Sequence, residues 1–352
     1  MATPARLQSV DILRGLVMVI MTLDHVRDFY TTAGPRPEDL GNATAALFLT
    51  RWITHFCAPT FMFTAGLGAY LGGSRKSRGE LSRFLLTRGL WLMVLAVTVE
   101  NFVVSFRPVP VLLITLWALG ASMVALSGLV WLPLRVVSVL SVGVIALHNT
   151  ADPVQGSGLW NVLHLPGAFA VGGITVFAAY PLIPWFAVMA AGYAFGPMLE
   201  GPSRRVIVTG LSITAAFVVV RGLNLYGDPS PWMPARAVLS FLNTTKQPPS
   251  LDFLLMTLGP AIVVLGLVSH WHLPERHLLL VLGRVPLFYY LIHLYAIHLT
   301  AVGLAAIGLA PHGVSLTAVW LIWPLVVLAM YPLCAWYAGI KRRRTDWWLG
   351  YL

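Results

Sequence analysis

Charged residues are scarce in this chain. They make up 10% of its 352 residues, whereas 58% of the residues are hydrophobic. An ordinary soluble domain carries about 25% charged residues, so this composition argues against one. Apolar segments of about twenty residues recur along the chain, and such segments are long enough to cross the hydrocarbon core of a bilayer. The sequence therefore indicates an integral membrane protein that contacts membrane lipids.

Cysteine is almost absent. The chain has two, Cys57 and Cys334, and both fall inside apolar segments without the spacing of a metal site. This excludes a disulfide framework and gives no reason to expect thiol chemistry. We expect no bound metal.

Acidic residues are fewer than basic ones, 13 against 23, which gives a net charge of +10. The basic residues gather between apolar segments and in the tail KRRRT at 341–345, a pattern that orients a membrane protein, so we expect no nucleic-acid partner. Asp11 and Arg14 interrupt the first apolar segment, and no small-residue cleavage site follows closely. We expect an uncleaved first span.

The apolar segments predict an all-α fold, a polytopic membrane helix bundle that forms a single domain over 1–352. The sixth segment is too long for one straight span, and Pro181 and Pro184 interrupt it, so it is expected to contain a half-helix or kink. About ten transmembrane helices are expected, or eleven if that segment divides. The predicted spans are 8–31, 47–71, 83–105, 110–131, 134–149, 168–199, 205–226, 251–271, 277–299 and 315–338.

The distribution of Lys and Arg predicts that both termini are cytoplasmic. With the N-terminus inside, twelve Lys and Arg residues, Arg75 among them, fall on the inner side and five, including Arg107, on the outer side. Two long outer loops, near 149–167 and 226–250, are rich in Pro, Trp, Gly and Asn. We expect them to form a lid or a surface for a substrate.

Several predicted spans carry an ionisable residue at a similar depth, roughly 9–12 Å from the outer face on a rise of ~1.5 Å per residue. Each such group costs ~2.5–3.5 kcal/mol in lipid, which favours one shared polar pocket. For any single histidine, a helix-bridging hydrogen bond is the alternative. Lys246, in the second outer loop, is a further candidate substrate-binding residue. The candidates within the spans are His25, His55, Glu100, Arg221 and His293.

A second group of charges lies toward the predicted inner face. Arg14 and His25 are eleven residues apart, three helical turns, so they share one face about 16 Å apart in depth. Arg83, Arg88 and Arg284 lie on the same inner side as Arg14. Guanidinium groups bind phosphates bidentately, so these arginines are candidate contacts for a phosphate-bearing cofactor. Membrane anchoring is the alternative, above all for Arg83 and Arg88.

Histidine suits a general base because its pKa lies near neutral pH. His25 is the favoured base, with His55 facing it from the next span. Asp28 is one helical turn from His25 and is the expected orienting partner, whereas Asp24 points about 100° away around the helix. All four are candidate catalytic residues.

Four segments carry a resemblance to a known family. They are SVDILRGLVMVIMTLDHVRDF, RWITHFCAPTFMFTAG, TTKQPPSLDFLLMTLGP and GRVPLFYYLIHLYAIH. Together they resemble bacterial membrane proteins related to the catalytic domain of heparan-α-glucosaminide N-acetyltransferase. The Arg14-to-His25 spacing is also similar to the first-span motif of acyltransferase family 3, which acylates surface glycans. The resemblance implies a protein of the bacterial cytoplasmic membrane that transfers an acyl group, usually acetyl from acetyl-CoA, to an extracytoplasmic amine or hydroxyl of a sugar or glycan.

The sequence departs from the lysosomal enzyme's motif. That enzyme has Asn in place of His25, Asp in place of His55, and a His-Ala-x-Trp-Asn-Gly segment that the loop AGPRPEDLGNATAALFLTRW lacks. The donor, the acceptor and the choice of O- or N-transfer stay open. A carrier or channel for a small anion or sugar, with the polar layer as its binding site, is the main alternative. A regulatory or scaffolding protein is a third, and oligomers are compatible with all three.

Overall fold

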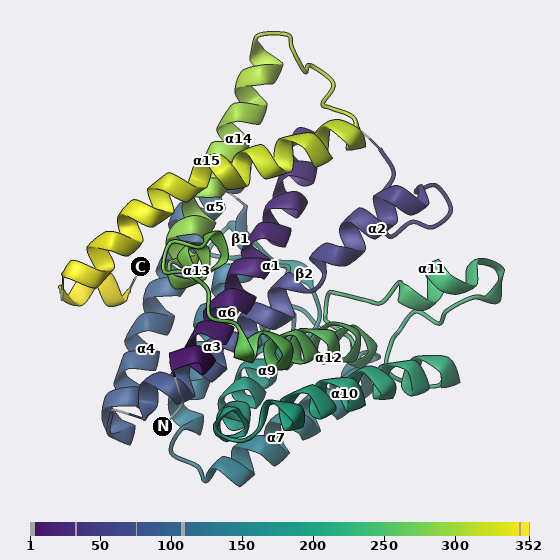
Figure 1. The fold of residues 1–352 in the computed structure, drawn as a ribbon. Coiled ribbons are helices and arrows are strands. Elements are labelled where there is room, and N and C mark those ends of the chain that lie inside the picture. The colour runs from purple at the N-terminus through teal and green to yellow at the C-terminus, as the bar shows by residue number, and fades with distance from the viewer. Residues whose placement is uncertain (1–3, 32–33, 75, 107–109, 345, 352) are drawn as a thin grey trace.

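Helices make up most of the structure, a computed structural model that describes residues 4–31, 34–74, 76–106, 110–344 and 346–351 (Figure 1). About 72% of the chain is helical. Two residues used for the orientation, Arg75 and Arg107, lie outside the described residues. The predicted helical fold is confirmed at this level, with a small sheet added.

Helix α1 (Pro4–Tyr30) passes through the middle of the bundle and packs against α3, α13, α14 and α15. Its closest approach is to α13 (Leu278–Arg284), where Gly15 lies on the backbone of Leu279 and Gly283 on that of Asp11. A Cβ on either glycine would collide with a backbone carbonyl. These two glycines therefore let the Arg14 end of α1 lie directly against α13.

The second predicted span is broken into α2 (Ala45–Thr54) and α3 (Cys57–Gly73). Pro59 has no N–H to donate to the carbonyl of His55, four residues earlier, so the helix cannot continue unbroken through this turn. His55 consequently sits at the junction of the two helices.

The remaining helices pair along the bundle. Close pairs are α10 with α12, α4 with α6, α3 with α9 and α7 with α9. Helix α4 continues through a π-helical turn, Ala96–Glu100, into α5, and α7 continues through a 3₁₀ turn, His148–Ala151. The other bounds are α4 Arg78–Leu95, α5 Asn101–Ser105, α6 Thr115–Leu129, α7 Leu134–Leu147, α8 Leu159–Leu163, α9 Leu182–Phe195, α10 Ser203–Leu223, α11 Ala237–Leu242, α12 Leu251–Leu267, α14 Pro286–Ala306 and α15 Leu316–Arg343. Short 3₁₀ turns lie at Gly196–Glu200, Pro234–Arg236, Val268–His270 and Trp347–Gly350.

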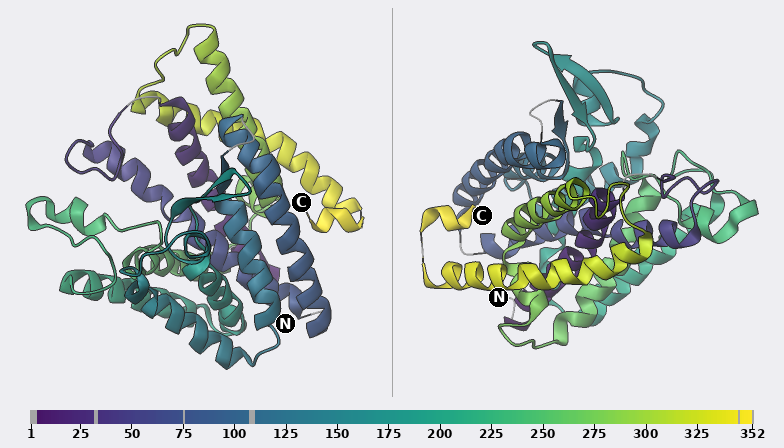
Figure 2. Two further views of the ribbon diagram at one scale, coloured as in Figure 1. Left: turned by 180° about the vertical axis from the view of Figure 1, so that it is seen from behind. Right: turned by 90° about the horizontal axis from the view of Figure 1, so that it is seen from above.

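A three-stranded sheet replaces part of two predicted spans. Strand β3 (Ile174–Ala178) lies in the centre, parallel to β1 (Val111–Leu113) and antiparallel to β2 (Gly167–Val171). The prediction of one broken helix over 168–199 is therefore wrong in its first part. Gly172 and Gly173, with φ of 55° and 82°, make a two-residue turn that favours a hairpin over a helix. Seen from above, the hairpin lies on the opposite face of the molecule from α15 (Figure 2).

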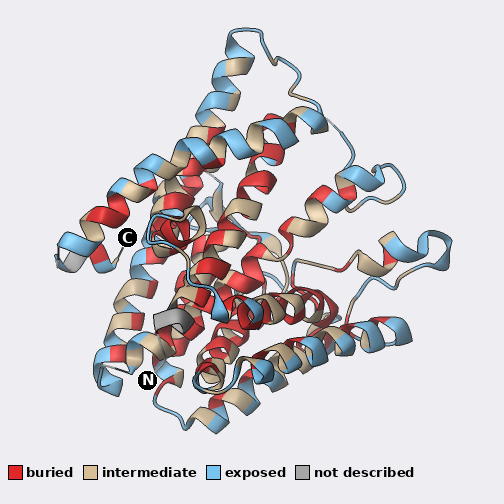
Figure 3. Ribbon diagram, in the orientation of Figure 1, coloured by how far each residue is buried: buried red, intermediate tan, exposed pale blue. Residues whose placement is uncertain are grey.

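Seven helices among the described residues are long and apolar enough to cross a membrane. The predicted count of ten is not confirmed by this measure. Helix α1 has the length but carries too many charges, while α6 is short and α2–α3 is broken. The outer faces of α7, α10 and α15 expose large apolar side chains such as Val139, Val219 and Leu321 (Figure 3). Such faces fit a lipid environment, as expected of an integral membrane protein.

Candidate active site

A cavity of about 280 Å³ opens beside α1, between α3, α4, α6 and the start of α14. Most of its wall is apolar. Along α1 the first lining residue is Arg14 and the last is Met21, about 10 Å further at ~1.5 Å per residue. Arg88 also lines the cavity, as does Tyr290. The cavity therefore combines two cations, a long apolar wall and a tyrosine.

Tyr290 connects this cavity to a buried polar group. Its hydroxyl donates to the carboxylate of Glu100, which also accepts from the backbone N–H of Leu116 at 3.2 Å. Its ring lies 6.1 Å from the ring of His25 and 5.9 Å from that of His293. Three members of the predicted polar layer, His25, Glu100 and His293, are thus brought together around one tyrosine.

The hydrogen bonds of the two histidines fix their tautomers. His293 Nδ1 lies 2.8 Å from the carbonyl oxygen of Tyr289, and His293 Nε2 lies 2.7 Å from His25 Nδ1. A carbonyl only accepts, so His293 Nδ1 carries the proton and its Nε2 must accept from His25 Nδ1. In the neutral state this leaves the Nε2 of His25 unprotonated. The pair therefore presents a basic nitrogen on His25.

Asp24 and Asp28 lie in an ionic cluster beside this pair. Arg27 contacts Asp24 at 2.9 Å and Asp28 at 2.5 Å, and Arg51 pairs with Asp24. The Asp28 side chain is 53% exposed and bound to Arg27. The ring-nitrogen partner of His25 is consequently His293, and the orienting position expected for Asp28 is taken by that histidine.

His55 lies at the far side of the same ionic cluster, 1% exposed, with its Nε2 3.9 Å from Glu38 and its ring against Phe253. Arg51 donates to Glu38 at 2.9 Å. Burial raises the pKa of Glu38, but its interactions with His55 and Arg51 outweigh burial and hold the pKa below its ordinary value. His55 thus belongs to the Glu38 side of the cluster and has no contact with His25 among the described interactions.

The four predicted inner arginines separate in the structure. Arg14 and Arg88 line the cavity, whereas Arg83 is exposed on α4. Arg14 donates to the carbonyl of Thr64 and lies 3.9 Å from Asp11. The other carboxylate oxygen of Asp11 lies 3.7 Å from Arg284, which also pairs with Glu275. Arg284 is therefore linked to the cavity through Asp11 but does not line it.

Arg221 occupies a separate place, at the base of the loop 226–250. Its buried guanidinium donates to four backbone carbonyls at 2.9–3.1 Å and lies 3.5 Å from Asp252. This set of contacts orders the loop. The four carbonyls are those of Ser230, Ser240, Phe241 and Asn243.

Lys246, from the same loop, lies over the ring of Tyr180 at 5.8 Å. It is half-buried. Of the two loop-side candidates for substrate binding, Lys246 therefore contacts an aromatic ring, whereas Arg221 is held by the carbonyls of the loop.

Sequence reasoning missed several residues here. Tyr290 precedes His293 by three positions, a spacing that places both on one helical face, and this signal was available. Glu38 and Arg51 come together only through the fold of the loop before α2. A further cluster of His148, Asp152 and His164 has metal-ligand chemistry although no metal was expected.

The family model described as heparan-alpha-glucosaminide N-acetyltransferase, catalytic, matches residues 6–232. This range includes Arg14, His25, His55, Arg88 and Glu100 and ends before α14. No curated protein sequence matches the chain. Because the match covers well over half of the chain, the protein belongs to the heparan-alpha-glucosaminide N-acetyltransferase catalytic family, a family of acyltransferases.

Proposed function

We propose that the protein is a membrane acyltransferase that takes an acyl group, in the first instance acetyl, from acyl-CoA on the cytoplasmic side. The acceptor is an amine or hydroxyl of a sugar or glycan on the other side of the cytoplasmic membrane of a bacterium, with both chain termini in the cytoplasm. The observation that carries the proposal is the cavity that runs along α1 from Arg14 to the neighbourhood of the His25–His293 pair.

The cavity fits the long arm of such a donor. Ligand pockets span about 300–1,000 Å³, and this cavity of about 280 Å³ lies at the small end of that range. It suits an acyl-pantetheine arm, with the nucleotide outside. Arg14 and Arg88 would hold phosphates by charged hydrogen bonds. Arg88 now donates to the carbonyl of Gly350, which a phosphate oxygen would replace.

The histidine pair supplies the base in this proposal. The acceptor's oxygen or nitrogen attacks the thioester carbonyl carbon while His25 Nε2 takes its proton, which gives a tetrahedral intermediate. That intermediate collapses, the carbon–sulfur bond breaks, and the CoA sulfur leaves with the proton from His25. His293 holds His25 in the tautomer that this step needs.

An enzyme is favoured over a carrier because different chemical groups lie at the two ends of the cavity along α1. A carrier for a small anion needs one binding site near the midplane. Here the cations Arg14 and Arg88 lie apart from the histidine pair, and an apolar wall with Met18 and Met21 lies between. That arrangement matches a donor that is charged at one end and reactive at the other.

Donor binding by the purified protein tests the proposal. Calorimetry in detergent should detect acetyl-CoA or CoA, and Arg88→Ala should weaken binding by about tenfold or more, since a charged hydrogen bond contributes ~1.5–3 kcal/mol. Arg83→Ala is the matched control, because Arg83 lies on the same helix but is exposed outside the cavity. Absence of binding by any CoA species at millimolar concentration, or equal effects of the two variants, would refute the cavity as the donor site.

A further inference from the structure

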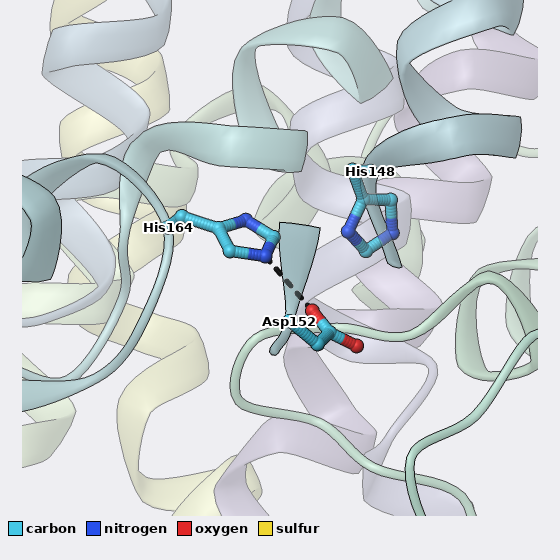
Figure 4. Close-up of side chains that lie close together, drawn as sticks. All are labelled: His148, Asp152 and His164. Carbon is cyan, nitrogen blue, oxygen red and sulfur yellow. Dashed lines mark hydrogen bonds and ion pairs between the residues drawn. The ribbon is translucent and has the colours of Figure 1, made fainter. Parts of the chain in front are cut away.

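Three side chains with metal-ligand chemistry converge away from the proposed donor cavity, where the ends of α7 and α8 come together (Figure 4). His148 opens the 3₁₀ turn that follows α7, Asp152 follows that turn, and His164 follows α8. One ligand atom from each lies within 4.8 Å of the others. The cluster joins the two ends of the loop 149–167.

His148 has an unusual environment. It is 6% exposed, and neither of its ring nitrogens has a hydrogen-bond partner within the described part of the chain. Buried polar atoms are nearly always hydrogen-bonded, so an imidazole with neither nitrogen paired calls for an explanation. In Figure 4 its ring stands beside His164 and Asp152, which are hydrogen-bonded to each other. The ring centroids of His148 and His164 are 5.7 Å apart. A ligand between the three side chains would pair it.

The other two residues already contact each other, and a bound metal would replace the hydrogen bond between them. His164 Nε2 lies 2.8 Å from Asp152 Oδ1, while Asp152 Oδ2 accepts from the side-chain amide of Asn149 at 2.8 Å. Asn149 in turn accepts from the backbone N–H of Leu251 at the start of α12. An outer partner that fixes the second carboxylate oxygen is typical of metal sites, where it orients the ligand.

We propose that His148, Asp152 and His164 bind one zinc ion. Two imidazole nitrogens and one carboxylate oxygen form a three-residue zinc set that leaves a fourth position for water, and Asp152, with a side chain 16% exposed, gives that water access. Tetrahedral zinc with bonds of about 2.0–2.1 Å places its ligand atoms roughly 3.3 Å apart. The three ligand atoms, which lie within 4.8 Å of one another, would draw together to that spacing when zinc binds. Imidazole ligands disfavour Mg²⁺ and Ca²⁺, which prefer oxygen.

Zinc binding is expected to stabilise the outer loop 149–167. A zinc ion would tie the end of α7 to the end of α8, and through Asn149 to the start of α12. This inference is independent of the acyl-transfer chemistry, because none of its residues lines the cavity beside α1.

The test uses the full chain in detergent, with any histidine tag removed and metal stripped by a chelator. Zinc alone is then added and measured by calorimetry and elemental analysis, with thermal unfolding recorded in parallel. The wild type should bind one zinc per chain and unfold at a higher temperature with zinc than without. Mg²⁺ and Ca²⁺ at the same concentration should do neither.

The variants His148→Ala and Asp152→Asn should weaken zinc binding by more than ~10–100-fold, the usual loss for a mere outer-shell partner. His148→Ala is the sharper variant, because it removes a side chain without a described hydrogen bond, and its unfolding temperature should not rise when zinc is added. His312→Ala, an exposed histidine elsewhere, is the control and should bind zinc normally. A wild type that binds no zinc, or a His148→Ala variant that binds it as well as the wild type, would overturn the proposal.

Discussion

Replacing His25 is the most direct test of the proposed chemistry. His25→Ala removes the nitrogen that accepts the acceptor's proton, a role that contributes ~10²–10⁴-fold in rate. We expect transfer to fall at least about a hundredfold, while donor binding persists because Arg14 and Arg88 are untouched. The assay measures transfer of labelled acetyl from acetyl-CoA to an amino sugar by protein in vesicles, with binding measured on the same preparation.

The structure also indicates how far the rate should fall in His293→Ala. This change removes the acceptor of the 2.7 Å bond from His25 Nδ1. A net hydrogen bond contributes ~0.5–1.5 kcal/mol, so the preference for the productive tautomer falls by about 2- to 13-fold. We therefore expect the reaction to be about 2- to 13-fold slower, with His293→Gln, which keeps an acceptor oxygen, partly restoring the rate.

A matched control separates catalysis from folding. His298 lies on the same helix and contacts the carbonyl oxygen of Val103 across to α5, so it is a helix-bridging histidine. His298→Ala should lower the unfolding temperature but leave transfer per folded molecule unchanged. Wild-type turnover by His25→Ala at matched protein level would refute the base assignment. A loss in His293→Ala as large as in His25→Ala would refute its positioning role.

The relation between Arg14 and the histidines shows what helical periodicity can predict. An eleven-residue interval predicted a face shared by Arg14 and His25; the cavity beside α1 is lined by Arg14, Met18 and Met21 of that helix, and by Tyr290, whose ring lies 6.1 Å from that of His25. Such local geometry follows from the rise and turn of one helix.

The partner of His25 could not be predicted in the same way. His293 is 268 residues away, and its placement depends on how α14 packs against α1. Sequence proximity instead favoured Asp28, but Asp28 forms an ion pair with the neighbouring Arg27. A local acid is therefore a weak guide to the partner of a buried histidine when a local cation competes for it.

Two residues at the same predicted depth in the membrane need not contact each other. Arg221 was placed in the same layer as His25, but depth fixes one coordinate and leaves the position around the bundle free. The carbonyls of the loop 226–250 supply its partners, and those carbonyls become available only once the loop is folded.

The wrong prediction of a helix at the start of 168–199 has a different cause. Its composition is apolar, yet the pair Gly172–Gly173 is a hairpin signal that outweighs composition.

Three further perturbations test the orientation of the chain, the order of the loop 226–250 and the charge of Glu38. A cysteine introduced at Arg78 should be labelled from the cytoplasm and one at Asn243 from outside; labelling of position 243 from the cytoplasm alone would reverse the proposed orientation. Arg221→Met leaves four carbonyls and Asp252 without their donor, so we expect a loss of about 3–5 kcal/mol in unfolding free energy, as for a broken buried ion pair, measured by denaturant titration. An unchanged midpoint would contradict the role of Arg221 in ordering the loop. For Glu38, interactions with His55 and Arg51 hold the folded pKa below its unfolded value of about 4.3. A carboxylate with a depressed folded pKa binds fewer protons in the folded state, so its contribution to stability is complete above pH ~4.3 and declines as the pH falls below it. The stability advantage of the wild type over Glu38→Gln should therefore be constant from pH 7 to pH 5 and shrink toward pH 3. Thermal unfolding across this range measures it, and an advantage that stayed constant down to pH 3 would show that Glu38 makes no charge interaction in the folded protein.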